Sequence, residues 1–411
     1  MGPSPGDKTI CLPFESEERY QQYLADRGIG RQYLEQLRQQ HPELFPPEMD
    51  QGFSFYGTYA SAKQQLNLRR IQLRATQEVY QIRPSFVMPY MIARTKEIEK
   101  ALYLRQWGVP FDALAYVFGR DAMFWYRAWL ALGQPSLVGT TVKDPQTLPV
   151  HLVADEKHTW LQGEKVYLAT TVAKGCILGV GVVPSAGTED LEQGYGQFAQ
   201  EARQLSPTYA PETVCTDGWE ATRAAWKKLF PRITLILCFL HSVLKILDRC
   251  KRDAPWRATL KERAWHVYQA PTRGQFAQRL RRFREWAQAQ VPVGVLREAV
   301  LALCLKAPSF AAAYAFPQAH RTSNAVDRLM DQQDRLLYAM RYFHGTLTSA
   351  TRAVRAQALL WNFHPFGART RRADANRSSP FGDLNGFHYH DNWLHNLLIA
   401  ASLGGRRTVP T

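Results

Sequence analysis

Apolar and polar positions predict a β-meander in the middle of the chain. Residues 149–172 predict two strands joined by a turn at 162–163, with the first strand ending on Asp155. The second strand is rich in β-branched and aromatic residues, which favour extended structure. A tight turn at 173–175 and an apolar run over 176–184 then predict a third strand, antiparallel to the second.

After the meander the pattern alternates between helices and strands. The expected elements are a helix over 189–205, a strand over 213–216 that ends on Asp217, a helix over 219–230, an apolar strand over 233–239 and a helix to about residue 251. The last strand is apolar enough to be buried on both faces. Strands alternating with helices are typical of α/β folds. We therefore predict a mixed five-stranded sheet with flanking helices.

Upstream of the sheet, the chain is predicted to be helical. Residues 1–83 are assigned to an N-terminal helical region, in which 60–77 is expected to form a helix with a basic face. Residues 84–143 form a second unit. Its helices are expected over 91–107, 111–118 and 122–132.

This second unit has the layout of a helix-turn-helix, in which the third helix enters the DNA major groove. The candidate DNA contacts are Arg120, Tyr126 and Arg127. An ordinary three-helix packing unit, with Trp125 and Trp129 in its core, would show the same pattern. Both interpretations stay open at the level of sequence.

Two regions follow the predicted sheet domain, whose first part covers 144–250. Residues 251–318 are expected to form an all-helical insertion, and 319–411 the last helices of the domain and a basic C-terminal region. The insertion interleaves arginines with aromatic residues, as surfaces that bind nucleic acid do. Arg281 and Arg282 are candidate phosphate contacts, although a solvated helical face would also be arginine-rich.

The chain is strongly basic, with 51 Lys and Arg against 36 Asp and Glu and a formal net charge of +15. This balance favours a polyanionic partner, most often nucleic acid. The six cysteines contain no CxxC pair, which favours a reducing compartment. The N-terminus lacks an apolar signal stretch, and no apolar run is long enough to span a bilayer. We expect a soluble cytoplasmic protein.

Several acidic residues lie at the ends of predicted strands or on one face of a predicted helix, where the fold could bring them together. If the first and fourth strands are neighbours, Asp155 and Asp217 lie side by side at one edge of the sheet. A late helix, with Thr322 or Ser323 as its expected cap, has Asp327, Asp331 and Asp334 on one face. Three acids on one face repel one another unless a cation lies beside them, or unless the face is simply solvated.

Four motifs follow one another along the chain: Ala154-Asp155-Glu156, Thr216-Asp217-Gly218, Cys238-Phe239-Leu240-His241 and Thr322-Ser323-Asn324-Ala325-Val326-Asp327. In this order they resemble a DDE-type transposase, closest in layout to the Mutator-like insertion-sequence group. The resemblance covers about residues 145–345. The family usually has glutamate at the last position, whereas Asp327 is one methylene shorter. Either three aspartates form the site, or the third ligand is displaced, or activity is lost.

The resemblance implies an RNase H-like fold and a metal-dependent enzyme that cleaves and joins DNA. Two Mg²⁺ or Mn²⁺ ions would be held by carboxylates, with Asp155 bridging both and Asp217 and Asp327 each holding one. His241, with Cys238, would support the site or contact the scissile region, or would only pack the strand end. Glu156 and His158 are further candidate ligands.

Partners and place in the cell follow from the same resemblance. The expected partners are transposon ends and target DNA, bound by a homodimer or higher oligomer because joining two ends needs two sites. We expect a prokaryotic, nucleoid-associated protein. The alternatives are an inactive DNA-binding protein derived from a transposase, and an RNase H-like nuclease.

Overall fold

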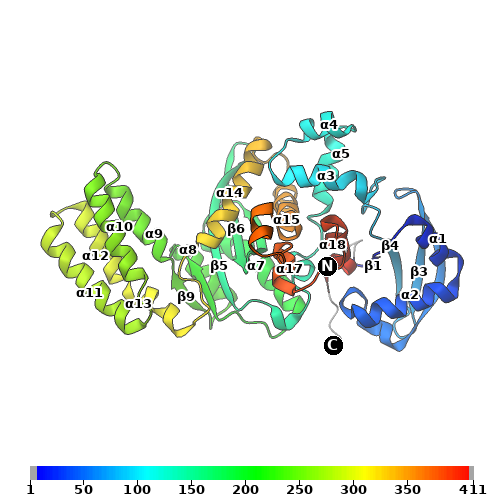
Figure 1. Cartoon of the computed structure of the whole chain (residues 1–411), viewed down its shortest axis with the longest axis horizontal. Coiled ribbons are helices and arrows are strands. Elements are labelled where there is room, and N and C mark those ends of the chain that lie inside the picture. The colour runs from blue at the N-terminus through cyan, green and yellow to red at the C-terminus, as the bar shows by residue number, and fades with distance from the viewer. Residues whose placement is uncertain (1–6, 407–411) are drawn as a thin grey trace.

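The molecule is elongated, with three lobes along its long axis (Figure 1). A lobe with a small sheet lies at one end, a larger sheet with its helices lies in the middle, and a helical lobe lies at the other end. The structure is a computed structural model that describes residues 7–406. None of the helices in that range is long and apolar enough to cross a membrane.

The N-terminal lobe contains a four-stranded sheet in the order β1-β4-β3-β2. β1 pairs with β4 in parallel, and the other pairs are antiparallel. Tyr20 and Tyr23 of α1 and Leu34 of α2 are buried in the same core as the strands. The elements are β1 (Thr9–Leu12), α1 (Glu17–Ala25), α2 (Arg27–Gln40), the 3₁₀ helices η1 (Pro42–Leu44) and η2 (Pro47–Gln51), β2 (Phe53–Ser61), β3 (Leu66–Leu73) and β4 (Val79–Pro84).

The helix predicted over 60–77 is therefore wrong, and the expected helical character of 1–83 holds only for its first half. Gln65 and Gln77 have positive φ and form turns at the two ends of β3. Within β3, Leu66 and Leu68, and then Ile71 and Leu73, are two residues apart, which is the strand period. The Gln and Arg residues between them favour helix, and this local preference was overridden by pairing with two strands.

The three helices predicted for the next unit are present. Asp121 caps α5 by accepting a hydrogen bond from the Phe124 amide (2.7 Å). Trp125 and Trp129 are buried in the core, as the packing interpretation expects. The first helix begins later than predicted. The bounds are α3 (Thr95–Gln106), α4 (Phe111–Phe118), α5 (Ala122–Ala131), α6 (Leu137–Thr141) and η3 (Pro145–Thr147).

The central sheet has five strands in the order β7-β6-β5-β8-β9, which confirms a mixed α/β fold. β5, β6 and β7 form an antiparallel meander, whereas β8 and β9 run parallel to β5. β9 is an edge strand and is only half-buried, in contrast to the burial predicted for it. The bounds are β5 (His151–Leu161), β6 (Glu164–Ala173), β7 (Cys176–Val183), β8 (Thr213–Thr216) and β9 (Thr234–Leu237).

β5 does not end at Asp155, as the sequence analysis predicts, but continues to Leu161. β6 pairs with β5 along the whole extension, from Val153 opposite Val172 to Leu161 opposite Glu164. This long hairpin holds Asp155 in the middle of a strand. The backbone around the acid is therefore held by the sheet rather than by a turn.

Helices cover both faces of the central sheet. α7 and α8 pack on one face, where Tyr195, Phe198 and Trp226 join the strand residues in one buried cluster. α14 and α15 pack on the opposite face (Figure 1). The bounds are α7 (Thr188–Leu205), α8 (Glu220–Leu229), α9 (Phe239–Arg249), α14 (Asn324–Ala339) and α15 (Leu347–Phe363).

The remaining helices form the end lobe and the C-terminal region. The insertion predicted over 251–318 is helical. Together with α9 it forms a buried core that is separate from the cores of the central sheet. Its bounds are α10 (Ala254–Tyr268), α11 (Arg273–Gln290), α12 (Val295–Leu305), α13 (Ala307–Ala311) and η4 (Ala312–Ala315). The C-terminal elements are α16 (Ala368–Ala373), α17 (Pro380–Asn385), α18 (Trp393–Ala400) and η5 (Ser402–Gly405).

Two glycines of α7 give a matched test of how closely this helix approaches the sheet. A Cβ at Gly194 would lie 2.9 Å from the Ala169 Cβ, whereas one at Gly196 would find its nearest neighbour at 3.8 Å. Gly194→Ala should lower the free energy of unfolding by about 1–3 kcal/mol through overpacking. Gly196→Ala should raise it by up to about 1 kcal/mol through helix propensity. Urea unfolding measures both, and equal effects would contradict this packing.

Candidate metal centre

Strand register places two of the predicted acids side by side, where β8 ends beside the middle of the central strand β5. β5 and β8 pair in parallel through residues 62 positions apart, such as His151 with Thr213. Asp155 and Asp217 are also 62 positions apart. The pairing of β5 with β8 ends at Val153 and Cys215, two residues before these acids, whereas Asp155 still pairs with Thr170 of β6.

Gly218 forms the sharp turn that directs the chain away from Asp217. Its φ is +89°, in a region that favours glycine. A Cβ at this position would overlap the Leu237 side chain of β9. The Asp217 carboxylate also accepts a hydrogen bond from the Trp219 amide (2.8 Å), which orients it at the start of α8.

Asp155 and Glu156 are neighbours in β5 and therefore point to opposite faces of the sheet. Asp155 is buried on the face covered by α14, and its carboxylate accepts a hydrogen bond from the Glu156 amide (2.9 Å). Glu156 points toward α7 and α8. There its carboxylate accepts hydrogen bonds from the hydroxyls of Tyr195 and Thr222, both at 2.6 Å.

The three acids on one face of α14 have different surroundings in the structure. Asp327, in the first turn, lies beside Asp155. Asp331 is exposed, and Asp334 forms an ion pair with Lys157 of β5. Of the three acids on this face, the structure thus brings only Asp327 next to Asp155.

His241 reaches the site from the first turn of α9, where one buried residue holds its backbone amide and another its ring. Cys238 caps α9 by accepting a hydrogen bond from the His241 amide (3.5 Å). The Ser323 hydroxyl lies 3.2 Å from His241 Nδ1 and 3.3 Å from Cys238 Sγ. Ser323 therefore does not cap α14 with its side chain, as the sequence predicts, but connects the ends of β9 and α14.

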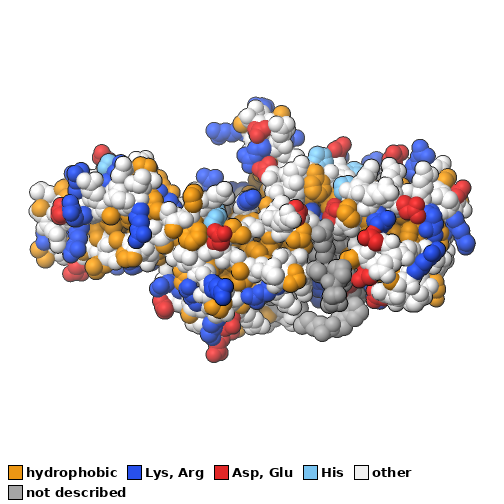
Figure 2. Space-filling view, turned by 90° about the horizontal axis from the view of Figure 1, so that it is seen from below, with side chains coloured by type: hydrophobic (Ala, Val, Ile, Leu, Met, Phe, Trp, Pro, Cys, Tyr) orange, Lys and Arg blue, Asp and Glu red, His pale blue; other side chains and the backbone are white. Residues whose placement is uncertain are grey.

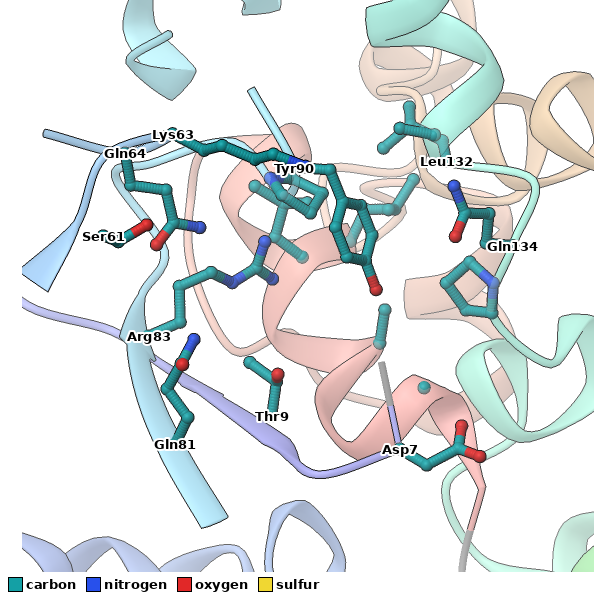
Figure 3. A pocket seen from close by; sticks show the side chains of 17 residues that line it. Asp7, Thr9, Ser61, Lys63, Gln64, Gln81, Arg83, Tyr90, Leu132 and Gln134 are labelled. Atoms are coloured by element: carbon teal, nitrogen blue, oxygen red, sulfur yellow. The ribbon is translucent and has the colours of Figure 1, made fainter. Parts of the chain in front are cut away.

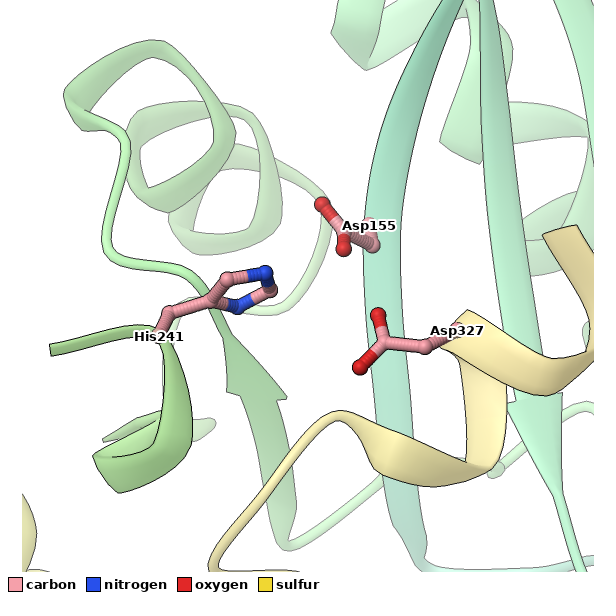
Figure 4. A group of neighbouring side chains, drawn as sticks. All are labelled: Asp155, His241 and Asp327. Atoms are coloured by element: carbon pink, nitrogen blue, oxygen red, sulfur yellow. The ribbon is translucent and has the colours of Figure 1, made fainter. Parts of the chain in front are cut away.

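These residues form two groups that could each hold a cation, and Asp155 belongs to both. The first group is Asp155, His241 and Asp327 (Figure 4). The second is Asp155, Glu156 and Asp217. Within each group, one ligand atom per residue lies within 4.8 Å of the others.

The electrostatics of the site reflect the crowding of acids. Burial, together with the neighbouring Glu156 carboxylate, raises the pKa of Asp155 to about 7, and His241 opposes this shift. Burial also raises the pKa of Asp327 and of Glu156. The pKa of His241 is raised first by its hydrogen bond with Cys238 and then by the charges of Asp155 and Asp327. A positive charge among these side chains is thus favoured.

The other predicted residues lie away from this cluster. His158 is exposed, further along β5. Arg120 and Arg127 are exposed around α5, whereas the ring of Tyr126 packs against Phe111 at a centroid distance of 5.6 Å.

Arg281 and Arg282 are exposed on α11, in the helical lobe. Arg281 forms an exposed ion pair with Glu285 at 3.6 Å. Such a pair contributes little to stability and leaves the guanidinium able to exchange partners.

Sequence reasoning missed the residues that position the acids and the histidine. Tyr195, Thr222 and Ser323 each contact a site residue that is far away in the chain. Ser323 had one signal, its place in the motif that precedes Asp327. Tyr195 and Thr222 had none, because their role depends on how two helices pack on the sheet.

Comparison with known proteins adds no assignment. A scan against protein-family models finds no match for the chain, and a search of curated proteins finds none either. The function is therefore argued from the geometry and chemistry of the site.

The raised pKa of Asp155 predicts how metal binding depends on pH. Because its pKa in the folded protein lies above that of an unfolded aspartate, ionisation of Asp155 lowers stability as the pH rises through about 7. Mg²⁺ or Mn²⁺ should therefore raise the thermal midpoint more at pH 8 than at pH 6. Differential scanning calorimetry measures this difference.

Variants make this prediction specific. Asp155→Asn should stabilise the metal-free protein at pH 8 by about 1–3 kcal/mol and should remove most of the stabilisation by metal. Asp331→Asn, an exposed acid on α14, is the control and should respond to metal as the unmodified protein does. Equal metal effects at both pH values, or in Asp155→Asn, would contradict the assignment.

Proposed function

We propose that the chain is a DDE-type transposase that cleaves the ends of a DNA element and joins them to target DNA. The order β7-β6-β5-β8-β9, with a meander followed by two parallel strands, supports an RNase H-like core. The helical lobe between β9 and α14 supports the insertion expected from the resemblance.

One observation carries the proposal: Asp155 is shared by two groups of potential metal ligands. Phosphodiester cleavage by two metals needs a carboxylate common to both ions, with further ligands on either side. Asp217 lies in one group and Asp327 in the other, which supports the assignment of one ion to each. Asp327 reaches Asp155 although it is shorter than glutamate, which favours an active enzyme over an inactive derivative.

The donor set suits Mg²⁺ or Mn²⁺. Carboxylate oxygens are the ligands that these hard cations prefer, and the pKa values of Asp155 and Asp327 are raised where the acids are crowded. When bound, the two ions would activate the attacking oxygen and stabilise the leaving oxygen. Asp155, Asp217 and Asp327 would hold the ions, and Glu156 is a further ligand candidate.

The protein's own groups contribute position and charge. Cys238 holds the backbone amide of His241, and the Ser323 hydroxyl holds its ring near Asp155 and Asp327. In the metal-free protein the raised pKa favours the protonated ring. With a cation bound between Asp155 and Asp327, the neutral imidazole would instead be a ligand beside these two acids. The hydroxyls of Tyr195 and Thr222 donate hydrogen bonds to Glu156 on the face of the sheet that α7 and α8 cover.

Two basic hollows beside the site support a path for DNA. A groove of about 480 Å³ begins at His241 and runs between α9 and α12, where Lys245, Arg249 and Lys306 line it. A smaller hollow near Gly218 is lined by Arg223 and again by Lys306. Lysines and arginines that line such hollows can neutralise backbone phosphates. Figure 2 shows further Lys and Arg side chains spread over the helical lobe.

The activity test uses DNA that carries the inverted repeats flanking the gene. With Mg²⁺ or Mn²⁺, the full chain should cut the repeat ends and join them to a target plasmid, as sequencing gels of the products would show. Asp155→Asn, Asp217→Asn and Asp327→Asn should each lower the rate by roughly a hundredfold or more. Asp331→Asn is the matched control and should stay active.

The outcomes separate the candidate functions. Cutting without joining would identify a nuclease on the same fold. Sequence-specific binding without any cutting would identify an inactive DNA-binding derivative. Full activity of Asp155→Asn would contradict the metal centre.

The groove along α9 yields a separate prediction for DNA binding. Lys245→Gln, Arg249→Gln and Lys306→Gln together should weaken binding of end DNA and should lower the slope of log affinity against log salt by about 0.9 per lost phosphate contact. Lys165→Gln, an exposed cation on β6, is the control. Fluorescence anisotropy at several salt concentrations measures the slope, and an unchanged slope in the triple variant would contradict a phosphate path here.

A further inference from the structure

A second cavity lies far from the acidic cluster, where the N-terminal sheet meets the helices. Its volume is about 200 Å³ (Figure 3). β1 and β4 form one wall, and the turn after β2 forms another. The segment after α5 and the end of α18 close the remaining sides. The cavity thus joins parts of the chain that are distant in sequence.

Arg83 of β4 points its guanidinium into this cavity (Figure 3). The residue is only 6% exposed, and its Nε and Nη1 atoms find no hydrogen-bond partner among the described residues. A buried guanidinium with unsatisfied N–H groups is costly, because each donor has lost its water. Such a group is stabilised by an acceptor that enters the cavity, and an anion is the strongest one.

Further polar groups surround the same space. Lys63, in the turn after β2, is exposed and extends along the cavity toward Tyr90 (Figure 3). Tyr90 has a φ of +63°, which is unusual for a residue other than glycine, and its hydroxyl points inward. Gln64 is buried, and its Oε1 atom has no partner among the described residues. The carboxylate of Asp7 is paired with Arg406 at 2.8 Å.

We propose that this cavity binds a phosphate group. The Arg83 guanidinium presents a planar fork that fits two phosphate oxygens, and the Lys63 ammonium is a mobile point charge for a third. Two cations match a dianionic phosphomonoester better than a carboxylate, which has one charge. The Tyr90 hydroxyl donates a further hydrogen bond.

The size of the cavity limits the ligand. The cavity of about 200 Å³ is small but opens to solvent, so a phosphate can enter it while the group attached to the phosphate lies at its mouth. The source is either a free mononucleotide or phosphate ion, or the 5′-phosphate of a DNA end. The proposal does not depend on the metal centre, because no residue is common to the two sites.

Titration calorimetry on the full chain tests the proposal. Inorganic phosphate and adenosine monophosphate, at constant ionic strength, should bind at one site per chain, and adenosine should not bind. Lys63→Ala and Arg83→Lys should each weaken binding by about tenfold, since each removes charge-assisted hydrogen bonds. Lys100→Ala, an exposed cation on α3, is the control and should bind as the unmodified protein does.

The variants are chosen so that misfolding does not obscure the result. Lys63 is exposed, so Lys63→Ala decides the outcome if circular dichroism shows Arg83→Lys to be unfolded. No binding of either phosphate compound at millimolar concentration, equal binding of adenosine, or unchanged affinity in Lys63→Ala would overturn the proposal.

A competition experiment identifies the source of the phosphate. Short DNA strands with a 5′-phosphate or a 5′-hydroxyl are added to the adenosine monophosphate complex. Displacement only by the phosphorylated strand assigns the cavity to a DNA end. Displacement by neither strand assigns it to a free small molecule, and both outcomes support a phosphate site.

Discussion

The crowding of acidic side chains around Asp155 is the constraint on which the central lobe depends. Carboxylates that are partly buried together repel one another, and burial with Glu156 raises the pKa of Asp155 to about 7. The fold holds them together with rigid elements: the long β5–β6 hairpin, the turn at Gly218 and the first turn of α14. Repulsion between these carboxylates lowers the stability of the metal-free protein, and a bound divalent cation would offset it.

Buried contacts around Ser323 link the helical lobe to this site. The chain leaves the sheet after β9, forms α9 to α13, and returns at Ser323. The Ser323 amide donates to Cys238 Sγ (3.2 Å), so the end of β9 and the start of α14 are held together. The positions of His241 and Asp327 therefore depend on each other, although the lobe between them has a separate core.

Local patterns were sufficient to predict the elements of the central sheet, because β-branched runs and turn residues agree with its pairing. They also pointed to Asp155 and Asp217, since acids after short strands stand out, whereas Asp327 was chosen from the acidic face of a helix and from the resemblance. They failed where distant pairing decides the structure. β5 runs past Asp155 because β6 pairs with it there, and the two-residue spacing of Leu66 and Leu68 was obscured by helix-favouring neighbours. The cavity at Arg83 has no local signal, and Ser323 had only its place in the motif that precedes Asp327.

The central claim is that Asp155 is shared by two cations. Anomalous diffraction from crystals soaked in Mn²⁺ tests it most directly. The account predicts two peaks roughly 4 Å apart on either side of the Asp155 carboxylate, one beside Asp217 and the other beside Asp327. Strong Mn²⁺ peaks elsewhere on the protein with none at Asp155, or a site formed by Asp331, would contradict it.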